Sequence, residues 1–194
     1  MNLTRATAPA ATPVSLAEVK DHLRVEHNED DALITLYLGA AVAHLDGDEG
    51  ILGRALVTQT WDQTIDDFPH GDDLALMLAG VQSVTSIAYR DMSGATQTFP
   101  AESYMLRHRH GLTWVHLKDD YTWPETDDEP GAVTVRFVAG YGDAAAVPAA
   151  LKAAMLLHVG HMYENREPVI IGQSVASLPM AYDALVAPYR VRRF

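Results

Sequence analysis

The spacing of apolar side chains divides the chain into a helical segment, a long extended segment and a second helical segment. Ser15 is followed three residues later by Glu18, the spacing of a capping box, and apolar residues then recur with a helical period. We predict a first helix over Leu16–Leu23. The acidic run at residues 26–31 favours a second helix N-terminus, and we predict that helix over residues 30–45.

The second predicted helix is apolar on nearly all of its faces. Within residues 32–45 the clearly polar side chains are Thr35 and His44. Such a helix must be covered on several sides, either by other helices of a bundle or by a neighbouring subunit. The glycine-rich run at residues 46–53 then ends the helix.

The middle of the chain carries the pattern of short strands. Residues 57–68 alternate between apolar and polar side chains and are rich in Thr, Val, Ile and Trp. Further strand signals, separated by turns or polar loops, lie at residues 75–78, 81–89, 95–99, 104–107, 113–117 and 132–139. The connections are too short for helical crossovers, so we predict an antiparallel sheet within residues 56–142.

Helical character returns after the predicted sheet. Pro148 suits the first turn of a helix, and we predict a long helix over Ala149–Glu164 and a short one over Met180–Val186. The predicted fold class is therefore α+β: a small helical bundle with an inserted antiparallel β region and an extended C-terminal arm. The corresponding parts are an N-terminal arm (1–12), a helical core (13–55 and 143–167), the β insertion (56–142) and a C-terminal docking arm (168–194).

Composition narrows the classes of protein that fit this pattern. The chain has 194 residues, a formal net charge of −12, 48% hydrophobic residues and no cysteine. The hydrophobic content excludes disorder, and the lack of cysteine excludes disulfides, cysteine zinc sites and a thiol nucleophile. An acidic chain also argues against a reader of duplex DNA, which needs basic surfaces.

Membrane and targeting signals are weak in this sequence. The longest nearly apolar windows, residues 32–45 and 147–159, are shorter than the roughly 18–20 residues that span a bilayer. Residues 1–13 lack the continuous apolar stretch of a signal peptide. We therefore expect a soluble protein that is assembled in the cytoplasm and has no membrane partner.

The strongest metal-like pattern is His158-x-x-His161-x-x-Glu164. Residues three apart share a helix face, and two histidines with a carboxylate can bind zinc or iron. The alternative is structural, because imidazoles near a helix C-terminus hydrogen-bond its last carbonyls and suit its dipole. The zinc-protease spacing is absent. A small metal-binding α+β enzyme that uses His158, His161 and Glu164 is thus an alternative function.

Other candidate chemistry favours solvated loops over sites. His108, His110 and His116 flank a predicted turn with two arginines, and an acidic loop covers residues 119–129. The calcium-loop order of acids around a central glycine is missing from that loop. No glycine-rich phosphate loop and no nucleophile elbow occurs. We therefore expect no enzyme, no metal and no cofactor.

The last residues form a basic and aromatic tail on an acidic body. Arginine and aromatic residues are enriched at interface hot spots. We predict a docking segment there, and the alternative is a frayed terminus. The candidate binding residues are Tyr189, Arg190, Val191, Arg192, Arg193 and Phe194.

Four stretches, residues 13–25, 30–42, 53–69 and 130–167, together resemble one family. They are similar to the head–tail connector, or adaptor, proteins of tailed bacteriophages and gene transfer agents. The resemblance implies a ring, commonly of twelve copies, beneath the portal in the neck of the particle. It also implies that the ring closes the neck after DNA packaging, receives the tail through a stopper protein and reaches the portal through its C-terminal arm.

The resemblance makes a structural adaptor the expected function, with DNA passing through the ring only as non-specific cargo. A neck stopper or a tail terminator is an alternative within the same class, although stoppers are usually small β barrels without helices of this kind. One stretch departs from the family: relatives end the second helix differently from the HLDGDEGI of residues 44–51. The geometry of that junction therefore stays open at this point.

Overall fold

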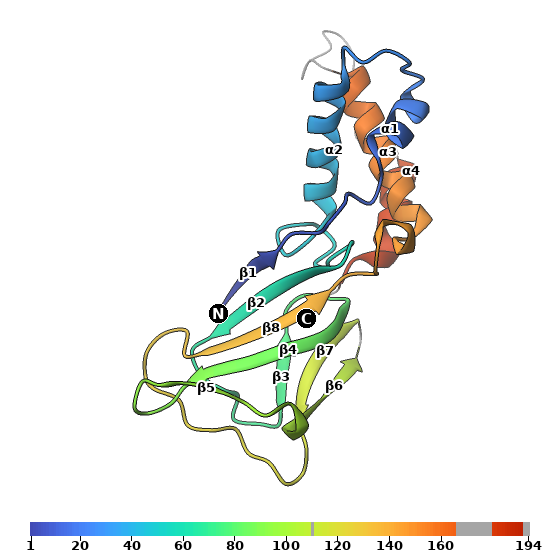
Figure 1. The fold of residues 1–194 in the computed structure, drawn as a ribbon. Helices are drawn as coiled ribbons and strands as arrows, with labels where there is room; N and C mark the ends of the chain where they lie inside the picture. The colour runs from blue at the N-terminus through green and yellow to red at the C-terminus, as the bar shows by residue number, and fades with distance from the viewer. Residues whose placement is uncertain (110, 166–179, 192–194) are drawn as a thin grey trace, which may run out of the picture.

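The computed structural model describes residues 1–109, 111–165 and 180–191, and these residues form two parts. Figure 1 shows a helical bundle at one end of an elongated molecule and a group of β-strands, here called the β module, at the other. The bundle holds α1 (Leu16–Leu23), α2 (Asp31–Leu45), α3 (Ala149–Glu164) and α4 (Met180–Val186). The predicted α+β fold class, with a helical bundle and an antiparallel β region, is confirmed.

Local signals account for the ends of α1. Ser15 Oγ accepts a hydrogen bond from the Glu18 backbone N–H at 3.2 Å, and the Glu18 carboxylate accepts one from the Ser15 backbone N–H at 2.7 Å. This reciprocal capping box satisfies two backbone donors that the helix itself leaves unpaired. The hydrogen bond from the Ser15 backbone, with one from its hydroxyl, also lowers the pKa of Glu18. At the other end, Arg24 adopts a left-handed conformation with a φ of 57° and stops the helix.

The bundle core is built mainly by α2, α3 and α4. Ile34 and Leu45 of α2 and Leu151 and Met155 of α3 are fully buried. Tyr182 of α4 is 2% exposed in the same cluster, which α1 joins through Val19. The short α4 therefore belongs to the bundle core, although it lies within the predicted C-terminal arm.

The β module contains two antiparallel sheets. The five-stranded sheet has the order β1 (Asn2–Thr7), β2 (Gln59–Ile65), β8 (Val133–Ala139), β4 (Val81–Arg90) and β5 (Thr96–Thr98). The three-stranded sheet has the order β3 (Asp73–Leu76), β7 (Leu112–Leu117) and β6 (Tyr104–Arg109). Short 3-10 turns lie at η1 (Ala101–Ser103), η2 (Ala144–Ala146) and η3 (Ala187–Tyr189). The sequence pattern predicted β2 to β8 but neither β1 nor the division of the strands into two sheets.

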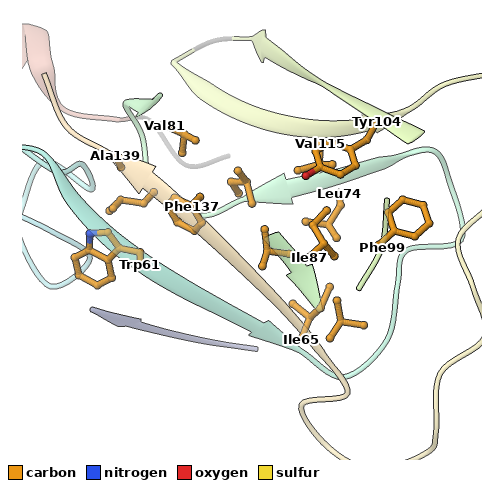
Figure 2. Close-up of a cluster of buried hydrophobic side chains, with 14 of the residues drawn as sticks. Trp61, Ile65, Leu74, Val81, Ile87, Phe99, Tyr104, Val115, Phe137 and Ala139 are labelled. Carbon is orange, nitrogen blue, oxygen red and sulfur yellow. The ribbon is translucent and has the colours of Figure 1, made fainter. Parts of the chain in front are cut away.

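The inner faces of the two sheets share one hydrophobic core. Alternate residues of β2, β8 and β7 are buried, as the period of two in a strand requires. Figure 2 shows Ile65, Ile87 and Phe137 of the large sheet near Leu74 and Val115 of the small sheet. The β module is therefore a two-layer sandwich with its own core.

The prediction of an N-terminal arm over residues 1–12 needs a correction. Asn2–Thr7 form β1, which pairs antiparallel with β2, so that Arg5 lies opposite Trp61. Its side chains are mostly exposed because it is an edge strand that lies outside the core. A strand of this kind shows no alternation of buried residues, so the sequence contained no signal for it.

Candidate docking surfaces

The described part of the predicted docking tail lies against the bundle. Tyr182 and Val186 of α4 are buried, and the backbone N–H of Val191 donates a hydrogen bond to the Leu52 carbonyl at 3.0 Å. Arg190 forms an ion pair with Asp183 at 3.3 Å, and both side chains are largely exposed. Residues 180–191 are thus packed on the body, and the expectation of an extended arm is corrected for this part of the chain.

The six candidate tail residues divide into two groups. Tyr189 packs against the bundle core, Arg190 is exposed and Val191 is half-buried. Arg192, Arg193 and Phe194 lie outside the described residues. Of the six predicted binding residues, only these last three come after the segment 180–191 that packs on the body.

The junction between bundle and β module is organised by one buried carboxylate. Asp46, 6% exposed at the end of α2, accepts hydrogen bonds from the Leu56 backbone N–H at 2.8 Å and from Gln59 Nε2 at 2.9 Å. It also forms an ion pair with Arg5 of β1 at 3.1 Å. The Arg5 guanidinium lies 4.9 Å from the centre of the Trp61 ring. Asp46 therefore connects α2, β1 and β2 in the region whose geometry the sequence left open.

One face of α2 is left uncovered by the described residues of the single chain. Leu36 is 67% exposed, and the other exposed residues of this face are small: Ala32, Thr35, Gly39, Ala40 and Ala43, of which Thr35 is polar. A methyl group built on Gly39 meets no described atom within 4 Å. A groove of about 610 Å³ continues from this face toward β1, lined by Val42, Ala43, Leu3 and Trp61 among others. An exposed apolar helix face of this kind is typical of a protein contact.

The predicted metal ligands do not form a metal site. Among residues 1–109, 111–165 and 180–191, no group of three histidine, cysteine, aspartate or glutamate side chains could hold a metal ion. His158 instead packs edge-on against His44, with ring centres 5.3 Å apart, and against Tyr182 at 5.6 Å. The Asn165 amide donates to the His161 carbonyl at 2.9 Å. The metal-binding interpretation of His158, His161 and Glu164 is therefore wrong for the described structure.

His158 nevertheless has unusual acid–base behaviour. Burial lowers the pKa of His158 below its ordinary value of 6.5, and the nearby His44 and His161 lower it further. Its Nδ1 atom is buried without a hydrogen-bond partner among the described residues. Burial also raises the pKa of the neighbouring Tyr182. Both shifts of pKa favour the neutral form of the side chain, because a charge at a buried position would lose its hydration.

The histidines around the β6–β7 hairpin do not converge on one point. His108 shares a hydrogen bond with Thr113 at 3.0 Å, and His116 pairs with Asp73 at 2.6 Å. Asp73 also lies 3.9 Å from Arg109, and His110 is outside the described residues. The described histidines contact residues of their own sheet, as expected for a structural role.

The acidic loop after β7 forms one wall of a groove, which sequence reasoning missed. The groove has a volume of about 650 Å³, and its apolar side contains Phe68, Trp123 and Met92. The rings of Phe68 and Trp123 stack 4.7 Å apart. We call it the acidic groove, because its carboxylates are Asp66, Asp67, Glu125, Asp127 and Asp128.

Three of those carboxylates form hydrogen bonds or an ion pair with other residues of the chain. Asp66 accepts from the Gly131 N–H at 2.9 Å, Asp67 accepts from the Thr126 hydroxyl at 3.0 Å, and Asp127 pairs with Arg90 at 3.1 Å. Glu125 and Asp128 are exposed. The groove is thus a shaped surface with exposed negative charge at its rim.

Comparison with known proteins supports a structural role. A family model described as phage gp6-like head-tail connector protein matches residues 13–103, from before α1 to η1. The predicted resemblance to head–tail connectors is confirmed. No curated protein sequence matches the chain. No helix among the described residues is long and apolar enough to cross a membrane.

Solved structures extend the resemblance to the complete chain. A chain from the neck of an empty gene transfer agent particle, computed with C6 symmetry, is 27% identical and has a TM-score of 0.81. A chain from the virion of a native gene transfer agent particle has 26% identity and a TM-score of 0.79, and one from a native neck with C12 symmetry has 26% and 0.77. Each match covers 100% of this chain and 97% of the other.

Proposed function

We propose that this protein is a structural adaptor that forms a ring in the neck of a phage-like particle, between the portal and the stopper or tail. The observation that carries the proposal is the likeness to neck chains over the whole length, with a TM-score of 0.81 and nearly full coverage of both chains. The match to the head–tail connector family over residues 13–103 supports it independently. Function here means placing and joining other proteins, without catalysis.

The exposed face of α2 supports assembly into a ring. Leu36 and its small neighbours leave an apolar surface that a second copy would cover. The related neck structures were computed with C6 and C12 symmetry, which fits a ring of twelve copies. Identical copies arranged around one axis supply such a cover at every position.

The charge of the chain suits a channel that DNA passes through. Each copy has a formal net charge of −12, and binding to DNA is driven mainly by positive contacts to phosphate. An acidic ring would leave the DNA free to slide. We therefore place DNA as transient cargo, and we expect assembly of the ring in the cytoplasm of the producing cell.

The tail is the proposed contact with the portal. Tyr189, Arg190 and Val191 are anchored beside the bundle, and this anchor would direct the residues that follow toward a partner. Arginine and aromatic side chains in such a segment suit a partly acidic, partly apolar portal surface. In this arrangement the binding residues are Tyr189, Arg190, Val191, Arg192, Arg193 and Phe194, and the stopper or tail would bind on the opposite side.

Truncation separates docking from folding. A chain that ends at Val191 keeps the hydrogen bond to Leu52 and lacks only the last three residues. We expect it to fold normally and to be lost from purified particles, as measured by immunoblotting. A control variant, Glu26→Ser on the bundle surface, should be retained. Particles that retain the truncated protein at the wild-type level would overturn the assignment of Arg192, Arg193 and Phe194 to the portal contact.

The observed fold favours the adaptor over the stopper or tail terminator. Stoppers are usually small β barrels, whereas this chain places α2, α3 and α4 in a helical core. The adaptor proposal itself is tested by reconstructing the neck of particles from the producing cells. Density for this chain in a ring next to the portal is expected, and its absence from the neck would refute the proposal.

A further inference from the structure

The outer faces of the two sheets in the β module differ in chemistry. On the five-stranded sheet, the outward positions of β2 and β8 are polar except for the half-buried Val138; they carry Thr60, Asp62, Thr64, Thr134, Arg136 and Val138. Arg136 donates two hydrogen bonds to Asp62, at 2.8 and 2.7 Å, so the charges on this face are paired locally. This composition is typical of a sheet face that stays in water.

The outer face of the three-stranded sheet is apolar, aromatic and basic. Residues of β7 alternate, so Leu112, Trp114 and His116 point away from the core that buries Thr113, Val115 and Leu117. Strand register places Trp114 between Ala75 of β3 and Arg107 of β6. We call this surface the basic sheet face; its members are Met105, Arg107, Arg109, Leu112, Trp114 and His116.

Two members of the basic sheet face are well exposed. Met105 is 43% exposed, and the Arg109 side chain is 56% exposed. The acid on this face, Asp73, is held by His116 at 2.6 Å and lies 3.9 Å from Arg109. An apolar and positively charged surface on a chain of net charge −12 fits an acidic partner, because opposite charges steer and orient association.

The acidic groove has the complementary properties. Glu125 and Asp128 are exposed at the groove, and Met92, 66% exposed, contributes an apolar wall with Phe68 and Trp123. In Figure 1 the β6–β7 hairpin and the turn between β4 and β5, which carries Met92, lie on opposite sides of the β module. The elements that carry the two surfaces therefore lie on opposite sides of the β module of one copy.

A ring of identical copies requires two complementary surfaces on different sides of each copy. Copies related by rotation about one axis meet through two different surfaces, so each copy needs two complementary patches that face its two neighbours. We propose that the basic sheet face of one copy docks into the acidic groove of the next copy around the ring. This inference rests on the proposed ring and names the surfaces that close it in the β module.

The DNA cargo is a less suitable occupant of the basic sheet face. The face offers two cations, Arg107 and Arg109, and Arg109 lies beside the carboxylate of Asp73. The chain as a whole is strongly acidic. A phosphate backbone would need more positive contacts to overcome that repulsion. The acidic groove of another copy satisfies both the charge and the apolar surface of Met105 and Trp114.

Cross-linking in assembled particles tests the contact directly. The wild-type chain has no cysteine, so the introduced thiols are the ones that can link one copy of this chain to another. With Met105→Cys and Asp128→Cys in one chain, a short bismaleimide should yield a ladder of oligomers, because each copy is linked to two neighbours. Each single variant should give no ladder. A control chain with Met105→Cys and Glu26→Cys, the latter on the bundle side, should also give none.

Charge reversal provides a second, independent readout. Arg107→Glu with Arg109→Glu should lower retention in particles by about tenfold, since like charges at the contact oppose docking. Glu125→Arg with Asp128→Arg should do the same. All four changes in one chain should restore retention, because every contact then pairs opposite charges again. Circular dichroism of each purified variant should show the wild-type fold, and Glu26→Arg should be retained normally.

The outcomes separate this inference from the proposed function. Wild-type protein missing from the neck would overturn the ring and this contact together. Wild-type protein present in the neck, with no ladder from the Met105→Cys and Asp128→Cys chain, would overturn this contact alone. A fourfold variant no better than either double variant would also overturn it. If Arg107→Glu and Arg109→Glu are added to the chain with Met105→Cys and Asp128→Cys, an intact ladder together with less packaged DNA would overturn the contact and assign the basic sheet face to DNA.

Discussion

The helical bundle and the β module use their apolar residues in different ways. Strands of the β module alternate: β2 and β8 bury one side and leave a mostly polar side in water, where Arg136 pairs with Asp62. The helix α2 is apolar on most faces, and the described residues of the chain cover the side of Ile34, Leu38 and Leu45. The large sheet of the β module buries its apolar side within one copy. The bundle, in contrast, contains more apolar surface than its described residues bury.

This difference teaches where to look for partners. A strand side chain that points outward and is polar has no need of cover, so a departure from that rule, as on the basic sheet face, indicates a contact. A helix that is apolar all round indicates a contact through its residue pattern alone. Changes in the core of the β module should therefore lower the stability of one copy. Changes on the exposed face of α2 should mainly affect assembly.

The largest expected loss of stability comes from the core of the β module. Phe137 is fully buried between the two sheets. Phe137→Ala should lower the free energy of unfolding by about 3–5 kcal/mol, because it removes apolar contacts and leaves a cavity. Urea unfolding followed by tryptophan fluorescence measures it. A loss below about 1 kcal/mol would mean that the two sheets do not share this core.

The second largest loss of stability is expected at the junction between the bundle and the β module. Asp46→Ala removes the acceptor for Leu56, Gln59 and Arg5 and leaves buried donors unpaired. We expect a loss of about 2–3 kcal/mol, and a smaller one for Asp46→Asn, which keeps one acceptor. Urea unfolding again provides the values. Equal losses for both variants would show that charge, and not hydrogen bonding, joins the two parts.

The histidine cluster predicts a moderate dependence on pH. Burial, with His44 and His161, lowers the pKa of folded His158 below 6.5, so the unfolded chain takes up a proton more readily. The stabilising contribution is therefore complete above pH 6.5 and is lost as the pH falls through the folded pKa. The melting temperature should fall from pH 7.5 to about 5.5, a range that spans the ordinary histidine pKa.

A pair of variants assigns that pH dependence. His158→Leu keeps an apolar side chain against His44 and Tyr182 and should flatten the melting profile over this range. His22→Gln, on the exposed side of α1, should leave the profile unchanged. If both variants retain the wild-type profile, other groups cause the acid sensitivity.

The smallest effect on one copy is expected on the exposed face of α2. Leu36→Ser should change the unfolding free energy by less than about 0.5 kcal/mol, because that side chain is 67% exposed. The same change should lower retention in particles if a second copy covers this face. The variant Glu26→Ser, also exposed, should alter neither quantity. Normal retention of Leu36→Ser would remove α2 from the ring contact.

Local signals made the helices predictable. The bounds of α1, α3 and α4 match those predicted, because a capping box, a proline in the first turn and helical periodicity act within a few residues. The strands of the β module were also predicted in number and rough position, apart from β1. That edge strand has exposed side chains and so no pattern that sequence reasoning could detect.

The candidate sites were less predictable than the elements. The spacing of His158, His161 and Glu164 suggested metal ligands. In the structure, the packing of α2 and α4 places the His158 side chain against the rings of His44 and Tyr182 instead. Asp46 looked like one of several acids in a loop, and only its distance to Arg5 and Gln59 reveals its role. The acidic groove joins three separate loops, so no single stretch of sequence could show it.

By itself, the amino-acid sequence determined the helices, most strands, the acidic charge and the resemblance to head–tail connectors. These properties depend on neighbouring residues or on sums over the chain. The tertiary structure alone decided the division into two sheets, the link through Asp46, and the placement of the acidic groove and the basic sheet face on opposite sides. Each of these depends on contacts between residues far apart in sequence, which local patterns of polarity do not encode.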